Sequence, residues 1–147
     1  MVKNMVIFGP PGSGKGTQIN EMKAYLRLES IASGDIARRL AEKDPIVAEK
    51  MAKGELIDDQ LIFSELEKTI AGISQDTSII FDGFPRNLEQ AEMLNSLLFR
   101  LNRRLEKAIY IYLDEEEVVK RLAIRKVCEK CGRPLYSEKG CPDCCGK

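Results

Sequence analysis

A short apolar run that leads directly into a glycine-rich turn constrains this chain more than any other feature. Residues 5–8 read Met-Val-Ile-Phe, and residues 9–17 read Gly-Pro-Pro-Gly-Ser-Gly-Lys-Gly-Thr. The run predicts a buried strand, and the sequence after the turn predicts a helix. Glycine lets the backbone approach a ligand closely, and amides at a helix N-terminus attract anions. The pattern predicts a phosphate-binding loop; the alternative is a glycine turn that only caps a helix.

The loop departs at one place from the common G-x4-G-K-[ST] pattern. Lys15 matches the lysine that reaches the β- and γ-phosphates, but Gly16 follows it and the hydroxyl comes one residue later, at Thr17. We expect Thr17 to serve as the Mg²⁺ ligand of this loop.

Composition excludes several classes of function. The 147 residues can bury one core, and 23 basic side chains balance 23 acidic ones, which argues against nucleic acid or a membrane as the main partner. No apolar stretch approaches the ~20 residues of a membrane span, and the N-terminus shows no export signal, so we expect a cytoplasmic protein. The absence of histidine excludes a catalytic triad of the usual kind.

Apolar runs alternate with helical patterns along the chain, which predicts an α/β fold with a parallel sheet. The expected strands are residues 5–8, 30–32, 78–81 and 108–113. The expected helices after the one that follows the loop are residues 36–43, 46–53, 59–70, 88–104 and 115–126. The roughly 45 residues between the second and third expected strands are too many for a single crossover, so residues 34–57 are interpreted as a small helical insertion.

All five cysteines fall within the last twenty residues. Cys128 and Cys131 form one C-x2-C pair, and Cys141 and Cys144 form a second, with Cys145 adjacent. Two such pairs this close are typical of a tetrahedral Zn²⁺ site. Disulfides or a redox motif are the alternatives, and Cys145 could replace Cys144 as a ligand.

Three further motifs, taken with the loop, resemble those of adenylate kinases. They are Ser33-Gly34-Asp35-x2-Arg38, Asp82-Gly83-Phe84-Pro85-Arg86-x3-Gln90 and Arg121-x3-Arg125. The resemblance implies a P-loop NTPase-like parallel sheet flanked by helices, made of residues 1–32 and 62–126. It also implies a helical NMP-binding insertion at 33–61 and a small zinc-knuckle lid at 127–147, with zinc stabilising the lid.

The same resemblance implies Mg²⁺-dependent phosphoryl transfer from ATP to AMP, giving two ADP. The implied ATP-binding residues are Gly12, Ser13, Gly14, Lys15, Gly16, Thr17, Arg121, Leu135 and Tyr136. The implied AMP-binding residues are Ser33, Arg38, Glu55, Leu56, Ile57, Gly83, Phe84, Pro85, Arg86 and Gln90, of which Gln90 would contact the adenine edge. The implied catalytic residues are Lys15, Asp82, Arg86 and Arg125.

Side-chain chemistry supports these assignments independently. Arg38 and Arg86 offer paired donors that match a phosphate dianion. Asp82 ends an apolar strand, where we expect its carboxylate to hold Mg²⁺ through a water, because Mg²⁺ usually keeps several of its own waters. Arg121 and Arg125 are four residues apart and share a helix face.

Each assignment has a structural alternative. Asp82 could cap a turn, and Arg121 and Arg125 could form a solvated helix face with partners such as Glu117. Ser33 stands where threonine is common in the family, so another nucleoside monophosphate could be the acceptor. A catalytically silent nucleotide- and zinc-binding fragment is the remaining alternative, whereas the N-K-x-D motif of a GTPase is absent.

The resemblance also implies segments beyond Lys147: the rest of the lid, further arginines, a long helix, a fifth strand and a final helix. We therefore expect this chain to be a fragment, a short relative or a chain completed by a partner. Family members are usually monomeric, but an exposed sheet edge would permit self-association.

Overall fold

The computed structural model describes residues 3–123, 126–127 and 134–135. Two compact units divide the chain. The first contains residues 1–8 and 15–110, and the second contains residues 9–14 and 111–147. Each unit is described by itself.

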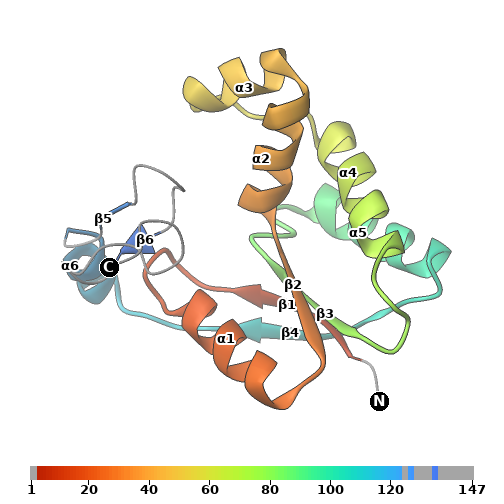
Figure 1. The fold of residues 1–147 in the computed structure, drawn as a ribbon. Coiled ribbons are helices and arrows are strands. Elements are labelled where there is room, and N and C mark those ends of the chain that lie inside the picture. Colours follow the sequence, from red (N-terminus) through yellow and green to blue (C-terminus); the bar gives the residue numbers. More distant parts are fainter. Residues whose placement is uncertain (1–2, 124–125, 128–133, 136–147) are drawn as a thin grey trace. The chain divides into compact units, whose positions relative to one another are not determined.

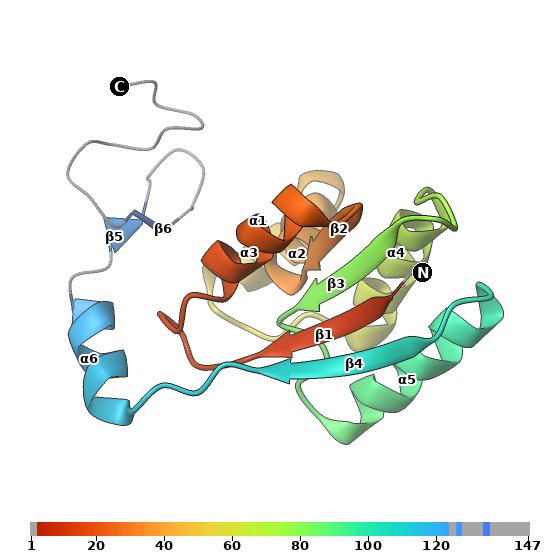
Figure 2. The same ribbon diagram turned by 90° about the horizontal axis from the view of Figure 1, so that it is seen from below.

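The first unit is built on a four-stranded parallel sheet. Its strands are β1 (Asn4–Phe8), β2 (Leu28–Ala32), β3 (Ser78–Asp82) and β4 (Leu105–Tyr110). Their order across the sheet is β2-β3-β1-β4, so that β1 and β3 are central (Figure 2). The predicted parallel α/β fold is confirmed.

Helices cover both faces of this sheet (Figure 1). Helix α1 (Lys15–Tyr25) lies on one face, while α4 (Asp59–Ala71) and α5 (Leu88–Arg100) lie on the other. Helices α2 (Ser33–Lys43) and α3 (Pro45–Ala52) lie between β2 and α4 in the chain. They form the helical segment that the sequence predicts as an insertion.

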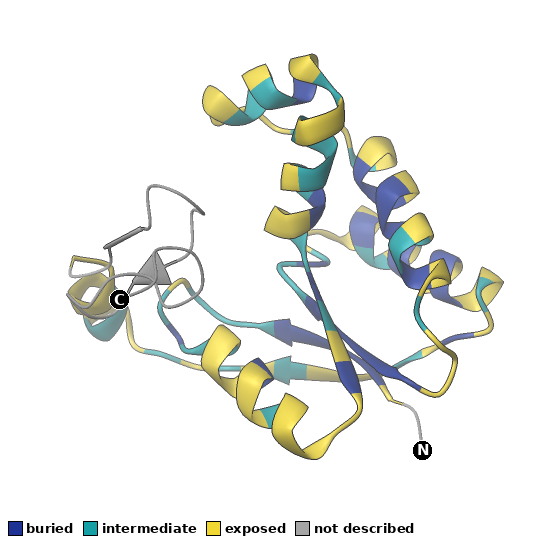
Figure 3. Ribbon diagram, in the orientation of Figure 1, coloured by how far each residue is buried: buried dark blue, intermediate teal, exposed yellow. Residues whose placement is uncertain are grey.

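The main core lies between the sheet and helices α4 and α5. Val6, Ile31 and Phe81 are register partners on β1, β2 and β3, so they share one face of the sheet and are buried there. Leu66 from α4 and Leu97 from α5 belong to the same cluster and are almost fully buried. Figure 3 shows the central strands as the most deeply buried part of this unit, as expected for a parallel sheet covered on both faces.

Side-chain caps determine where α4 and α5 begin. Asp58 Oδ1 accepts a hydrogen bond from the Gln60 amide at 2.7 Å, and Asn87 Oδ1 accepts one from the Gln90 amide at 2.7 Å. Both bonds satisfy amides that have no partner within the helix.

Three elements end at least three residues earlier than expected, and α2 and β4 begin three residues earlier than expected, at Ser33 and Leu105. The last strand was expected at 108–113, but β4 ends at Tyr110, because Tyr110 pairs with Phe8 and β1 ends there. The helix expected at 88–104 ends at Arg100, since the chain turns at Asn102 with φ of 54° and reaches β4 at Leu105. The helix expected at 115–126 ends at Ala123, and Lys126 already belongs to a strand.

The described part of the second unit contains α6 (Glu115–Ala123) and a two-stranded antiparallel sheet. The strands are β5 (Lys126–Val127) and β6 (Pro134–Leu135). Across the described residues of the whole chain, no helix is long and apolar enough to cross a membrane.

Candidate functional site

A pocket of about 320 Å³ opens in the first unit beside the carboxyl end of β3. Its lining comes from the turn after β3, helix α2, the last turn of α3, the segment between α3 and α4, and the first turns of α4 and α5. Its lining residues are Ser33, Gly34, Ala37, Met51, Gly54, Glu55, Leu56, Ile57, Asp59, Ile62, Gly83, Phe84, Arg86 and Gln90.

The pocket gathers most of the residues that the sequence predicts as one binding site. Those that line it are Ser33, Glu55, Leu56, Ile57, Gly83, Phe84, Arg86 and Gln90. Arg38 and Pro85 do not line it, although the Arg38 guanidinium lies 3.5 Å from where a Cβ on the lining residue Gly34 would be.

Several lining residues were missed by sequence reasoning. Met51 and Ile62 look like ordinary apolar positions of a helix, and no motif includes them. Asp59 follows the Asp58 cap and so looks like a first-turn acid placed for the helix dipole. Only the tertiary structure brings it to Gln90.

The turn after β3 brings its backbone unusually close to Ser33. Gly83 has φ of +77°, a left-handed conformation that favours glycine. A Cβ on Gly83 would lie 2.5 Å from Ser33 Oγ. Glycine is therefore required here both for its conformation and for the space that the serine occupies.

Arg86 holds this turn together and points its donors toward Ser33. Its Nε donates to the Gly83 carbonyl oxygen at 3.0 Å, and its Nη2 donates to Ser33 Oγ at 3.0 Å. Arg38, on α2, forms an ion pair with Asp35 one turn earlier. Both guanidinium groups are substantially exposed, so an anion in solution can reach them.

Asp82 is the last residue of β3 and directly precedes this turn. Burial raises the pKa of the Asp82 carboxyl above its ordinary value, and Asp35 raises it further, whereas Lys15 and Arg86 lower it. Lys15, the first residue of α1, is thus close enough to act on Asp82 electrostatically. The candidate phosphate lysine and the candidate magnesium carboxylate belong to one charged cluster.

The glycine loop itself, residues 9–14, belongs to the second unit. Gly9, Gly12 and Gly14 all have positive φ, and a Cβ on Gly9 would lie 2.7 Å from the Ile111 carbonyl oxygen. Ser13 is buried, and its hydroxyl has no hydrogen-bond partner among the described residues. Positive φ values and the lack of space for a Cβ are typical of a glycine backbone that another segment or a ligand approaches closely.

Arg121 connects α6 to this loop. Its Nη1 donates to the Gly12 carbonyl oxygen at 3.2 Å, and its Nε donates to Glu117 Oε1 at 2.7 Å. Arg121 therefore has the i,i+4 partner of the alternative interpretation and, in addition, a hydrogen bond to the glycine loop. The two are compatible, because different nitrogens of one guanidinium make them.

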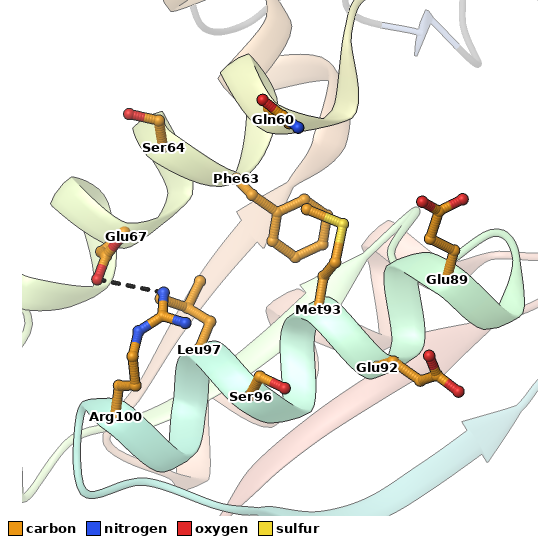
Figure 4. Close-up of a pocket in the computed structure, with 10 residues that line it drawn as sticks. All are labelled: Gln60, Phe63, Ser64, Glu67, Glu89, Glu92, Met93, Ser96, Leu97 and Arg100. Atoms are coloured by element: carbon orange, nitrogen blue, oxygen red, sulfur yellow. Dashed lines mark hydrogen bonds and ion pairs between the residues drawn. The ribbon is translucent and has the colours of Figure 1, made fainter.

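A second, larger pocket of about 450 Å³ lies between α4 and α5 (Figure 4). Phe63, Met93 and Leu97 supply its apolar part, and Arg100 forms an ion pair with Glu67 across it at 3.5 Å. None of the residues predicted to bind nucleotide lines this pocket, so it is not the candidate site.

Several predicted site residues lie outside the described residues. They are Arg125, Tyr136, Cys128, Cys131, Cys141 and Cys144. Leu135 is described only as part of strand β6. Within the described ranges, no group of three or more acidic, cysteine or histidine side chains could hold a metal ion.

Comparison with known proteins identifies the family. The profile of the adenylate kinase family, described as "Adenylate kinase", matches residues 7–136. A protein of Dehalococcoides mccartyi named adenylate kinase is 40% identical over 144 residues, covering 95% of this chain and 66% of that protein. The adenylate kinase of Archaeoglobus fulgidus is 34% identical over 155 residues, covering 98% of this chain and 71% of that protein. The chain thus spans about two thirds of the length of these relatives, and it belongs to the adenylate kinase family.

Proposed function

We propose that this chain transfers the γ-phosphoryl group of ATP reversibly to AMP, giving two ADP, with Mg²⁺ bound to ATP. The observation that carries the proposal is the pocket beside β3, where exposed arginine donors, a glycine turn and Gln90 meet next to Asp82. Family membership supports the same reaction class, since the relatives are named adenylate kinases.

AMP is assigned to this pocket. Arg86 and Arg38 would hold its phosphate, because a guanidinium matches a phosphate dianion with two parallel donors. Both arginines would then exchange their present partners, Ser33 and Asp35, for phosphate oxygens. The other proposed AMP-binding residues are Ser33, Glu55, Leu56, Ile57, Gly83, Phe84, Pro85 and Gln90.

The ATP phosphates are assigned to the glycine loop and the start of α1. Amides of residues 12–17 would surround them, Lys15 would neutralise the β- and γ-phosphates, and Arg121 would contact the nucleotide. Leu135 and Tyr136 complete the proposed ATP site, and Arg125 would neutralise charge on the phosphoryl group in transfer. Because phosphoryl transfer depends mainly on positioning and charge stabilisation, these residues need no histidine.

Two metal ions belong to the proposal. Mg²⁺ is usually held by one or two carboxylates together with substrate phosphates and waters, so a single half-buried Asp82 with the Thr17 hydroxyl fits it. When bound, Mg²⁺ would neutralise charge that develops on the phosphates. Zn²⁺ is assigned to Cys128, Cys131, Cys141 and Cys144 from their spacing alone, as a structural ion.

The proposed organisation follows the sequence prediction. Residues 33–61 would form the NMP-binding insertion, residues 127–147 the zinc-binding lid, and the remainder the core. Closure of the lid would exclude water, which otherwise competes with AMP for the phosphoryl group. A cytoplasmic location is part of the proposal because free cysteine pairs that bind zinc suit a reducing compartment.

ADP formation from ATP and AMP by the purified chain with Mg²⁺ and Zn²⁺ tests the proposal. We expect turnover that Lys15→Ala and Arg86→Ala each abolish, with both variants folded by circular dichroism. Parallel reactions with CMP, UMP and GMP identify the acceptor. A folded wild-type chain that forms no ADP, or a higher rate with another monophosphate, would contradict the proposed reaction.

A further inference from the structure

The side-chain amide of Gln90 is held between two partners of opposite hydrogen-bonding character. Gln90 is only 9% exposed, and it lies in the first turn of α5 while lining the pocket. Its Oε1 accepts from the backbone amide of Arg86 at 2.8 Å. Its Nε2 donates to Asp59 Oδ1, on α4, at 2.8 Å.

These partners permit one orientation of the amide. A backbone N–H can only donate, and an ionised carboxylate can only accept. A half-turn of the amide would place its NH2 group against the Arg86 N–H and its oxygen against the Asp59 carboxylate. The flipped state loses both hydrogen bonds and creates two repulsive contacts.

We propose that Asp59 is a positioning residue that fixes the orientation of the Gln90 amide and thereby selects the base that the pocket accepts. This inference rests on the proposed binding of a nucleoside monophosphate there. With its two bonds made, Gln90 keeps one Nε2 proton and one Oε1 lone pair for a ligand. Asp59 and Gln90 both line the pocket, so the pair acts at the ligand.

The remaining donor and acceptor match one order of groups on a purine edge. Adenine presents a donor at N6 beside an acceptor at N1, whereas hypoxanthine presents an acceptor at O6 beside a donor at N1. A glutamine free to flip can pair with either edge, but a fixed one can pair with only one order. Excluding the flipped orientation of the Gln90 amide therefore lets the pocket discriminate adenine from hypoxanthine.

Binding of AMP and IMP to the wild-type chain and to Asp59→Asn, measured by isothermal titration calorimetry, tests the inference. The asparagine amide can present either an oxygen or an NH2 group to Gln90, so the flipped state is no longer opposed by a carboxylate. We expect the ratio of the two Kd values to fall about tenfold, an effect equivalent to about 1.4 kcal/mol. Asp59→Glu, which keeps a carboxylate, should restore part of the discrimination.

Asp58→Asn is the matched control. It removes a carboxylate from the same turn, but asparagine remains a good cap for the Gln60 amide. We expect its Kd ratio to equal that of the wild type. A ratio in Asp59→Asn within twofold of the wild type would overturn the inference.

Nuclear magnetic resonance of the ligand-free chain separates this inference from the proposed function. The Nε2 proton of Gln90 that faces Asp59 should exchange with solvent at least tenfold more slowly than those of the exposed Gln18, and Asp59→Asn, which no longer opposes the flipped amide, should reduce this protection. If the side-chain amide protons of Gln90 and Gln18 exchange at equal rates in the wild type, the inference is overturned even if AMP binds. Slow exchange in a chain that binds neither nucleotide supports the fixed amide and contradicts the proposed AMP site.

Discussion

Replacing Gly83 by alanine tests whether the turn after β3 is built around the close approach of Ser33. The left-handed conformation of residue 83 costs a residue with a side chain about 1–2 kcal/mol. The new Cβ would also lie 2.5 Å from Ser33 Oγ, so the hydroxyl must move and lose its hydrogen bond from Arg86. That bond contributes about 0.5–1.5 kcal/mol. We expect Gly83→Ala to lower the free energy of unfolding by about 2–3 kcal/mol.

A double-mutant cycle separates the two contributions. Ser33→Ala removes the Oγ but leaves the backbone conformation of residue 83 unchanged, and Cβ of residue 33 lies at an acceptable 3.4 Å. In the Ser33→Ala background, Gly83→Ala should cost only the free energy of the left-handed conformation. The coupling free energy between residues 33 and 83 should therefore be about 1 kcal/mol. Urea denaturation followed by circular dichroism supplies the four free energies. An equal cost of Gly83→Ala in both backgrounds would show that Ser33 Oγ does not restrict residue 83, and a cost below about 0.5 kcal/mol would show that the turn does not require glycine.

Three other changes test the core, the charges and the proposed zinc site. Leu66→Ala should destabilise the fold by about 2–5 kcal/mol because Leu66 is fully buried, whereas Leu61→Ala, at a residue 45% exposed, should cost far less in the same urea titration. The hydrogen bond from Lys43 lowers the pKa of the buried Glu65, although burial raises it. The ionised Glu65 carboxylate therefore stabilises the fold above the unfolded-state pKa of about 4.3. This stabilisation is lost as pH falls through the lower pKa of the folded state. Glu65→Gln should be less stable than the wild type at pH 7, with a gap that closes below about pH 4; a gap independent of pH would contradict this origin. Thiol modification should release one Zn²⁺ per chain, detected with a metal-binding dye, and lower the Tm; a chain purified without stoichiometric zinc would exclude the site.

Local patterns predicted the central strands well because these strands are covered on both faces. Residues 5–8 of β1 and 79–81 of β3 read as continuous apolar runs, and the polar residues Asn4, Ser78 and Asp82 lie only at the strand ends. The bounds of β4 were harder to predict, since it lies at one edge of the four-stranded sheet and contains Glu106 and Lys107. Its ends follow from pairing with β1 rather than from its own sequence.

In the candidate site, too, some residues could be predicted from local motifs and others could not. Ser33, Gly83 and Arg86 belong to recognisable motifs, and the structure gathers them into one pocket. Asp59 and Met51 belong to no motif, because their place depends on how α3, α4 and α5 pack. The bond between Asp59 and Gln90 joins residues 31 positions apart, and only a tertiary structure could reveal it.

The most direct test of phosphoryl transfer is a single-turnover reaction of ATP labelled at its γ-phosphorus with excess AMP. We expect the label to appear in the β-position of newly formed ADP, at a rate that Arg86→Ala lowers by at least a hundredfold, which corresponds to about 2.7 kcal/mol of lost charge stabilisation. Label found only in inorganic phosphate, or left in ATP by a folded chain, would contradict phosphoryl transfer from ATP to AMP.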